Sequence, residues 1–264
     1  MNKDSPFFFL LCLTVLISCS KKQDDASGEV SAGYKVVQVT NGGSIHGRVT
    51  LNGALVGLEK IEIQKDQDVC GGTHTNPALP GASGGVANCI IGIEKITAGK
   101  DFEKRDHTFD QNHCDFSPHV QIIPLGSEIL VSNSDKVIHN YHVNHNGETV
   151  LNEAQPEGVP PREIKLKSSG VHTVSCDVHP WMRGFIWIAD NPYYSITDTS
   201  GSFSLENVPP GKYKLFLWRD NWNVEELKNG TGNIESYRWG KDINQEKEVV
   251  VEDSKISEIN FIIP

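Results

Sequence analysis

The stretch SCDVHPWMRGFIWI (residues 175–188) places a cysteine, a histidine and a methionine three residues apart, at Cys176, His179 and Met182. Each of these side chains carries a soft or borderline metal-ligand atom. The stretch lies between two β-like runs, GVHTVS and GFIWI, and Pro180 helps to end the first of them. A short loop of this kind can direct a thiolate, an imidazole and a thioether toward one point, which indicates a metal site.

A second histidine is needed, because the usual copper geometry for such ligands is His₂Cys with a weak axial Met. Residues 129–143, ILVSNSDKVIHNYHV, predict a strand and a polar turn that lead to His139. The missing ligand therefore comes from a separate loop. The candidate set consists of His139, Cys176, His179 and Met182.

Two separated motifs, VSNSDKVIHNYHV and GVHTVSCDVHPWMRGFIWI, resemble the copper site of the cupredoxins, the family of type 1 blue copper proteins. The second motif is similar to the amicyanin-like loop, with its Cys-x-x-His-x-x-Met spacing, a proline after the histidine and Arg-Gly after the methionine. FSPHVQIIPLGSEILVSNSD also matches the strand before the first histidine in plastocyanin-like folds. The resemblance covers about residues 86–190 and implies one copper ion. In it, His139 and His179 are equatorial imidazole ligands. Cys176 supplies the thiolate and Met182 the long axial thioether.

Two further residues take roles from this resemblance. Asn140 matches the family's residue after the first histidine, which ties the two ligand loops together by hydrogen bonds. Val178 stands where the amicyanin-like pattern has a proline, so a backbone N–H is available near the Cys176 sulfur. The reduction potential is therefore not expected to match that of the pattern.

Pro180 and Trp181 sit beside His179 and allow two interpretations. They pack the loop, or they form an apolar docking patch for a partner around the ligand edge. The remaining histidines of this region are interpreted as ordinary hydrogen-bonded strand residues, with ligands of a second copper as the alternative. These are His113, His119, His142, His145 and His172.

The folded part reads as all-β. Short runs rich in Val, Ile, Thr and aromatic residues alternate with Gly, Pro, Asn and Asp, and no stretch shows a convincing 3.6-residue apolar repeat. We expect a Greek-key sandwich. The predicted strands cover residues 44–51, 86–93, 120–123, 129–133, 140–144, 162–167, 171–175 and 184–189.

The C-terminal part, residues 191–264, predicts a second and smaller β-sandwich. YYSITDTSGSFSLENVPPGKYKLFLWR has a period of two around two turns. It resembles the carboxypeptidase regulatory-like, prealbumin-type module, whose starting pattern G-x-I-x-G-x-V fits GSIHGRV at residues 43–49. Two arrangements follow. Residues 43–190 form the cupredoxin domain with an N-terminal extension, or part of residues 43–85 pairs with the second sandwich and the copper domain is inserted.

The chain has six cysteines. Cys176 belongs to the ligand motif, and two others lie in the N-terminal leader region. Of the remaining three, at most one pair forms a disulfide. We favour Cys70–Cys114, because both lie in polar, loop-like surroundings, whereas Cys89 falls in an apolar run that reads as a buried strand.

Residues 1–18 read as an export signal, with Lys3 before an apolar run that ends in LISC. This ending resembles the lipobox of bacterial lipoproteins, in which Cys19 becomes the acylated first residue. The alternative is a plain secretory signal whose cysteine falls there by chance. Residues 19–42 then form a flexible polar tether. The protein is expected in the bacterial cell envelope, lipid-anchored and facing the periplasm or cell surface.

The charge of the chain limits the classes of binding partner that are expected. The formal net charge is −10, from 24 Lys+Arg against 34 Asp+Glu, and no basic patch appears, so nucleic-acid binding is not expected. An acidic surface favours cationic partners. We therefore expect a carrier of single electrons between a redox protein donor and acceptor, such as a c-type cytochrome, and no enzyme activity. Copper delivery or storage is the alternative.

The anchor is open to a direct test. Cys19→Ala removes the acylation site, so we expect the protein to leave the membrane pellet or to remain unprocessed. Fractionation followed by immunodetection measures this, with Cys12→Ala in the cleaved leader as control. An unchanged membrane fraction in Cys19→Ala contradicts the lipobox.

Overall fold

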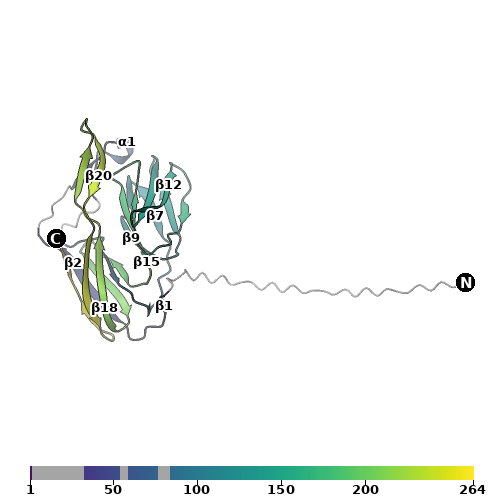
Figure 1. Cartoon of the computed structure of the whole chain (residues 1–264), viewed down its shortest axis with the longest axis vertical. Coiled ribbons are helices and arrows are strands. Elements are labelled where there is room, and N and C mark those ends of the chain that lie inside the picture. The colour runs from purple at the N-terminus through teal and green to yellow at the C-terminus, as the bar shows by residue number, and fades with distance from the viewer. Residues whose placement is uncertain (2–32, 54–58, 77–83) are drawn as a thin grey trace.

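The computed structural model describes residue 1 and residues 33–53, 59–76 and 84–264. The export signal, Cys19 and most of the tether lie outside the described residues. The described chain forms two β-sandwiches side by side (Figure 1). The predicted all-β class is confirmed. No helix in the described ranges is long and apolar enough to cross a membrane.

The first sandwich, here called the site sandwich, consists of a 4-stranded sheet in the order β13-β10-β7-β8 and a 5-stranded sheet in the order β12-β11-β14-β15-β9. Non-consecutive neighbours in both sheets show that the chain crosses between them. The strands are β7 (Thr108–Asn112), β8 (Asp115–Ser117), β9 (Val120–Pro124), β10 (Ile129–Asn133), β11 (His139–His145), β12 (Glu148–Gln155), β13 (Arg162–Ile164), β14 (Gly170–Ser175) and β15 (Arg183–Ala189).

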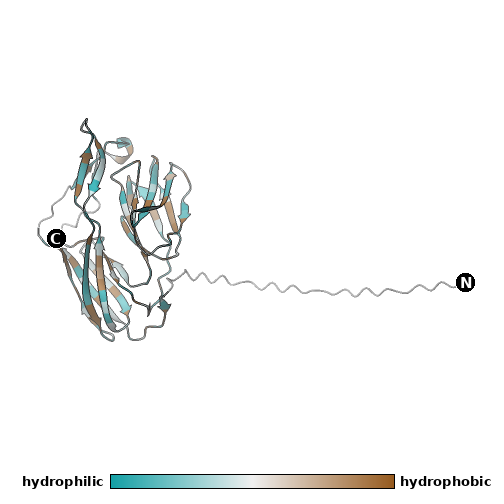
Figure 2. Ribbon diagram, in the orientation of Figure 1, coloured by the Kyte–Doolittle hydropathy of each residue, from teal (hydrophilic) through white to brown (hydrophobic). Residues whose placement is uncertain are grey.

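Alternating side chains build the core of this sandwich. Apolar and polar residues alternate along many strands, visible as brown and teal segments in Figure 2. Because successive side chains of a strand point to opposite faces, one face of each sheet is apolar. The inward residues form one cluster that includes Phe109, Phe116, Ile123, Val131, Tyr141, Val143, Val174 and Ile186.

The second sandwich, here called the flanking sandwich, pairs a sheet in the order β16-β5-β18-β21 with one in the order β17-β2-β22, where β23 also pairs with β2. A separate apolar cluster fills it, with Ile45, Ile91 and Leu217 among its members. The strands are β2 (Gly43–Leu51), β5 (Ile90–Ile93), β16 (Tyr194–Ile196), β17 (Ser202–Val208), β18 (Gly211–Arg219), β21 (Ile243–Val251), β22 (Ile256–Glu258) and β23 (Phe261–Ile263).

The strand pairing places the site sandwich inside the flanking sandwich in sequence. β5 and β16 are antiparallel neighbours in one sheet, with Ile90 opposite Ile196, and the site sandwich is the excursion between them. β2 pairs with β17 at Ile45 and Leu205. Of the two arrangements that the sequence left open, residues 43–51 adopt the one that joins the C-terminal sandwich. β5 also belongs to the flanking sandwich, although the sequence predicted that its residues lie in the copper domain. It lies between β16 and β18 in the flanking sheet, where its isoleucines are buried.

Two excursions from the flanking sandwich return to cover the site sandwich. The cap, residues 59–76, contains β3 (Lys60–Glu62), α1 (Gln67–Cys70) and β4 (Thr73–Thr75). The hairpin consists of β19 (Val224–Lys228) and β20 (Ile234–Trp239) and lies next to α1 in Figure 1. A short parallel pair, β1 (Lys35–Val36) and β6 (Ala98–Gly99), completes the fold.

The cap packs into the core of the site sandwich. Its Ile61 and Ile63 are buried in that core. The hairpin holds it from outside, since the Tyr237 hydroxyl donates to the Glu62 carbonyl at 2.6 Å. A disulfide joins Cys70 of α1 to Cys114 between β7 and β8, with the Cα atoms 5.3 Å apart, and this is the pair that the sequence favoured. Cys89 is buried as a free thiol.

Between the sandwiches, an aromatic layer surrounds a charged pair. Phe185 of β15 packs on Trp218 of β18, with ring centroids 5.0 Å apart. Beside them, His119 Nε2 lies 3.0 Å from Asp220 Oδ2, and the Asp220 side chain is fully buried. The other ring nitrogen of His119, Nδ1, lies 3.0 Å from the carbonyl of Arg183, the residue that follows the ligand loop.

The pKa of Asp220 reflects this cluster. Burial by itself raises that pKa, but the positive charges of His119, Arg219 and Arg183 outweigh it and lower the pKa overall. A carboxyl group with a depressed folded-state pKa stabilises the fold above its unfolded pKa of about 3.9. The contribution is lost as the pH falls through the folded-state value.

Asp220→Asn tests the junction. We expect the free energy of unfolding at pH 7 to fall by about 3–5 kcal/mol, the usual cost of breaking a buried pair. Because of the sign above, the difference from the unmutated protein should shrink below about pH 4. Urea unfolding at several pH values measures both effects. Glu163→Gln on the exposed face of β13 should change stability by less than about 0.5 kcal/mol, and an equal loss in both variants would contradict the role of the pair.

Candidate metal centre

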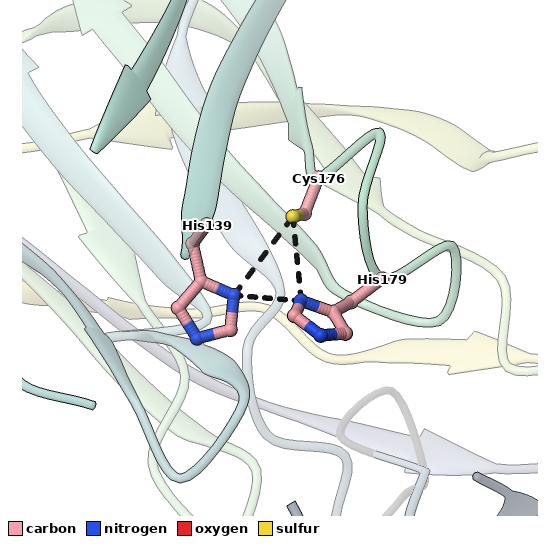
Figure 3. A group of neighbouring side chains, drawn as sticks. All are labelled: His139, Cys176 and His179. Atoms are coloured by element: carbon pink, nitrogen blue, oxygen red, sulfur yellow. Dashed lines mark hydrogen bonds between the residues drawn. The ribbon is translucent and has the colours of Figure 1, made fainter. Parts of the chain in front are cut away.

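Three donor atoms meet at one end of the site sandwich. His139 begins β11, and Cys176 and His179 lie on the loop between β14 and β15. The Cys176 sulfur is 3.9 Å from His139 Nδ1 and 3.7 Å from His179 Nδ1, and the two Nδ1 atoms are 2.8 Å apart. Figure 3 shows one nitrogen of each ring turned toward the sulfur. Residues 37 to 40 positions apart in sequence thus share one point.

The loop geometry explains how its side chains converge. The Met182 N–H donates to the His179 carbonyl at 2.9 Å, which closes a tight turn before β15. His139 and His179 are fully buried, and Cys176 and Met182 are 2% and 1% exposed. All four predicted ligands therefore lie in the interior, with Met182 in the apolar cluster that contains Cys176.

Each imidazole is held from behind by a carboxylate. His139 Nε2 lies 3.0 Å from Asp135 Oδ2, and His179 Nε2 lies 2.8 Å from Asp66 Oδ2. An ionised carboxylate only accepts hydrogen bonds, so each Nε2 carries the proton and donates it. In the neutral rings both Nδ1 atoms then present lone pairs, and the tautomer is assigned from this network.

This arrangement fits a metal cation. Two Nδ1 lone pairs facing each other at 2.8 Å next to a sulfur repel one another unless a positive charge lies between them. Two imidazoles, a thiolate and a thioether are the donor set of a blue-copper site, and Met182 is buried in the same apolar cluster as Cys176. Among the described residues, the other group of three such donors is Cys114, Asp135 and His139, but the Cys114 sulfur is already in the disulfide.

The local environment favours the ligating, neutral form of the two histidines, whereas the pKa of the Cys176 thiol is raised overall. Burial lowers the pKa of His139 and of His179, and their carboxylate partners offset this only in part, so the rings stay neutral. Burial raises the pKa of the Cys176 thiol. Backbone hydrogen bonds from Asn140, His179 and Val178 act in the opposite direction and favour the thiolate. The Val178 N–H, available because this position is not proline, is one of these donors.

Asn140 connects the two ligand loops. Its Oδ1 accepts from the Asp177 N–H at 2.7 Å, and its Nδ2 donates to Asp177 Oδ2 at 3.0 Å. Asp177 also accepts from His142 Nδ1 at 2.9 Å and from Asn152 at 2.8 Å. The segment after Cys176 is thus tied to β11 and β12, in the arrangement that the resemblance implied for Asn140.

Of the two interpretations that the sequence allowed for Pro180 and Trp181, the structure favours loop packing for Trp181. Trp181 is 3% exposed, lies with its ring tilted against that of His179 at a centroid distance of 5.0 Å and donates its indole N–H to the Cys114 carbonyl at 3.1 Å. It packs the loop and does not form an exposed surface, because the cap and the hairpin cover it. A hollow of about 260 Å³ remains beside the loop. Its lining is formed by Gln64, Lys65, Asp177, Val178, Pro180, Trp181, Ile234, Glu235 and Tyr237.

The five other histidines that the sequence offered as ligands of a second copper have protein partners, and none of them joins a group of three donor side chains in the described residues. His142 lies between Asp177 and Thr149. His145 and His172 stack with centroids 4.3 Å apart, and burial together with the neighbouring ring lowers the pKa of His172 to about 4. His119 belongs to the junction between the sandwiches. The backbone N–H of His113 donates to Asp135 Oδ1 at 2.8 Å, so this residue contacts the carboxylate behind His139 through its main chain.

Sequence reasoning missed both carboxylates. Asp135 stands four residues before His139 in NSDKVIH, so its proximity was readable but its role was not. Asp66 lies 113 positions from His179. No local pattern links the two, since the contact depends on the fold of the cap.

Comparison with known proteins gives partial structural matches. Neither protein-family models nor curated proteins match the chain. A copper-containing nitrite reductase from Thermus scotoductus SA-01 aligns at 23% identity and TM-score 0.30, over 34% of this chain and 24% of its own. A purple cupredoxin from Nitrosopumilus maritimus aligns at 24% identity and TM-score 0.29, over 32% of this chain and 100% of its own. A reduced amicyanin variant aligns at 14% identity and TM-score 0.30, over 34% of this chain and 87% of its own.

Asn140→Ala tests the link between the ligand loops. We expect the metal-free protein to lose about 1–3 kcal/mol of stability, because the Asp177 N–H and carboxylate lose a buried partner. Urea unfolding measures the loss. Asn144→Ala, on the same strand but hydrogen-bonded to Thr149 rather than to Asp177, serves as the matched control and should cost less. Equal stability of Asn140→Ala and the unmutated protein would show that the two loops are held together without a contribution from Asn140.

Proposed function

We propose that the protein is a lipid-anchored type 1 copper protein that carries single electrons between redox proteins of the bacterial cell envelope. The observation that carries the proposal is the buried convergence of His139, Cys176 and His179, each held by hydrogen bonds to the protein around it. Copper bound there would supply the one-electron chemistry of the Cu(I)/Cu(II) couple. The protein's own part is to keep the donors in place in both oxidation states.

The hydrogen bonds around the donors support this role. Asp135 and Asp66 orient the two rings, and Asn140 links the loops that carry the ligands. Such supporting partners keep ligands in one geometry and tune their basicity. A donor set that hardly moves when its charge changes favours rapid electron exchange, because little rearrangement accompanies the transfer.

The burial of the predicted ligands also helps to distinguish the two candidate functions. Copper delivery or storage requires the ion to enter and leave, which is easier where ligands are exposed. Here the histidine edge is covered by the cap, and a disulfide anchors the cap. The chain also has only two methionines. Electron transfer is therefore the function that the site supports best, and copper handling remains the second candidate.

We propose that the partner approaches at the hollow beside the ligand loop. Val178 and Pro180 line it together with Lys65, Asp177 and Glu235, so its rim carries more acidic than basic groups. With the formal net charge of −10, this favours a cationic redox protein such as a c-type cytochrome. The proposal includes no catalysed reaction.

The visible spectrum of the copper-loaded full chain tests the function. We expect an intense thiolate-to-copper charge-transfer band that Cys176→Ser abolishes, because a hydroxyl is a poor replacement for a thiolate. Far-UV circular dichroism should show that the β structure is retained. Met182→Leu is the comparison variant, which should keep the band and raise the reduction potential.

Two outcomes would count against the proposal. A full band in Cys176→Ser would overturn the ligand assignment. A normal protein that binds copper without the band, and releases it rapidly to a chelator, would favour copper handling.

A further inference from the structure

The covered edge of His179 is the feature that the proposed function does not explain. One of the two interpretations that the sequence allowed places a docking patch for a partner around this edge. The structure instead buries the ring and sets Asp66 Oδ2 2.8 Å from its Nε2. Asp66 comes from the cap, a segment that the flanking sandwich extends across the site sandwich.

We infer that Asp66 is a positioning residue of the metal centre, which holds the proton of His179 on Nε2, turns Nδ1 toward the shared point and closes the centre to solvent. The inference rests on the proposed function for its redox consequence. The hydrogen bond itself can be tested without a metal.

The backbone at Asp66 shows how firmly the contact is built. Asp66 has φ 50°, the left-handed conformation that few residues other than glycine adopt. Its carbonyl accepts from the Val69 N–H at 3.0 Å and from the Cys70 N–H at 2.8 Å, so the turn of α1 starts on it. A strained residue persists only where its surroundings determine it, and such residues cluster at functional sites.

The disulfide links this carboxylate to its counterpart. Cys70, at the end of α1, is bonded to Cys114. The Cys114 N–H donates to Asp135 Oδ2 at 2.7 Å, and the same oxygen lies 3.0 Å from His139 Nε2. One covalent bridge therefore connects the turn that carries Asp66 to the turn whose backbone N–H groups bind Asp135, and each carboxylate orients one of the two imidazoles.

The charges give the inference its redox consequence. A cation in the centre would have one thiolate as ligand and two carboxylates behind the imidazoles. Additional negative charge stabilises Cu(II) more than Cu(I), because the attraction grows with the charge of the ion. The Asp66 side chain is 33% exposed, so water screens part of its effect. Removal of its charge should still weaken Cu(II) binding more than Cu(I) binding.

The first experiment follows the imidazole protons. In the metal-free full chain with ¹⁵N-labelled histidine, we expect protected Nε2–H signals for both His139 and His179. Asp66→Ala should abolish the His179 signal by rapid exchange with water and leave that of His139. The matched control is Asp68→Asn, an exposed carboxylate on the same α1, which should leave both signals. Unfolding midpoints show whether each variant is folded.

The second experiment uses copper alone as the probe. Asp66→Asn keeps the size of the side chain but removes its charge, and we expect Cu(II) affinity to fall roughly 10–100-fold, the usual effect of losing such a partner. If Cu(I) affinity falls tenfold less, the potential rises by about 59 mV. Asp66→Ala should also speed the transfer of copper to a chelator. Asp68→Asn should change neither quantity.

The two inferences fail separately. A His179 Nε2–H that exchanges as fast in the normal protein as in Asp66→Ala overturns the role of Asp66, even where the blue band is present. An unchanged potential and release rate in Asp66→Asn and Asp66→Ala do the same. A protected His179 proton in a protein without the band supports the hydrogen bond from His179 to Asp66 and overturns the electron-transfer function.

Discussion

The candidate metal centre depends on two hydrogen bonds from imidazole N–H groups to carboxylates. A neutral histidine has one donor and one acceptor nitrogen, and the partner of one decides the direction of the other. Because Asp135 and Asp66 accept hydrogen bonds from the Nε2–H groups, both Nδ1 lone pairs face the Cys176 sulfur. Without these acceptors, the rings could turn or exchange tautomers, and nothing would keep the two Nδ1 atoms 2.8 Å apart.

The two excursions from the flanking sandwich offset the unfavourable desolvation of the buried rings and carboxylates. Buried rings and carboxylates lose hydration, which is unfavourable unless they are hydrogen-bonded. The cap adds Ile61 and Ile63 to the core of the site sandwich, and burial of each such side chain is worth about 1.5–3 kcal/mol. The flanking sandwich is thus more than a neighbouring module. Its chain extensions complete the wall of the site.

The parts of the site that follow local patterns could be predicted from the sequence. The spacing of Cys176, His179 and Met182 in one loop, and His139 with Asn140 at a strand start, fix side chains relative to their own backbone. Apolar runs bounded by turn residues predicted β9, β10, β11, β14 and β15, a period of two predicted β17 and β18, and the polar surroundings of Cys70 and Cys114 favoured their pairing. These features need no knowledge of how distant segments pack.

What could not be predicted depends on packing between distant segments. Asp66 meets His179 only because the cap folds across the ligand loop, and Trp181 is buried for the same reason. Val86 to Ile93 reads as apolar in any sheet, so the sequence could not tell that β5 pairs with β16 and β18. An apolar run specifies burial, and its partner is decided by the whole chain.

The disulfide makes so small a cap possible. Three-residue strands and a single helical turn are too short to be stable alone. A bridge between residues 44 positions apart restricts the unfolded chain by about 4 kcal/mol. That is comparable to what the buried isoleucines add, so the position of Asp66 depends on an oxidised Cys70. A cap of this kind requires an oxidising compartment, the kind of compartment in which the proposed function places the protein. In this chain, the disulfide that closes the loop between Cys70 and Cys114 also holds the turn whose Asp66 orients His179.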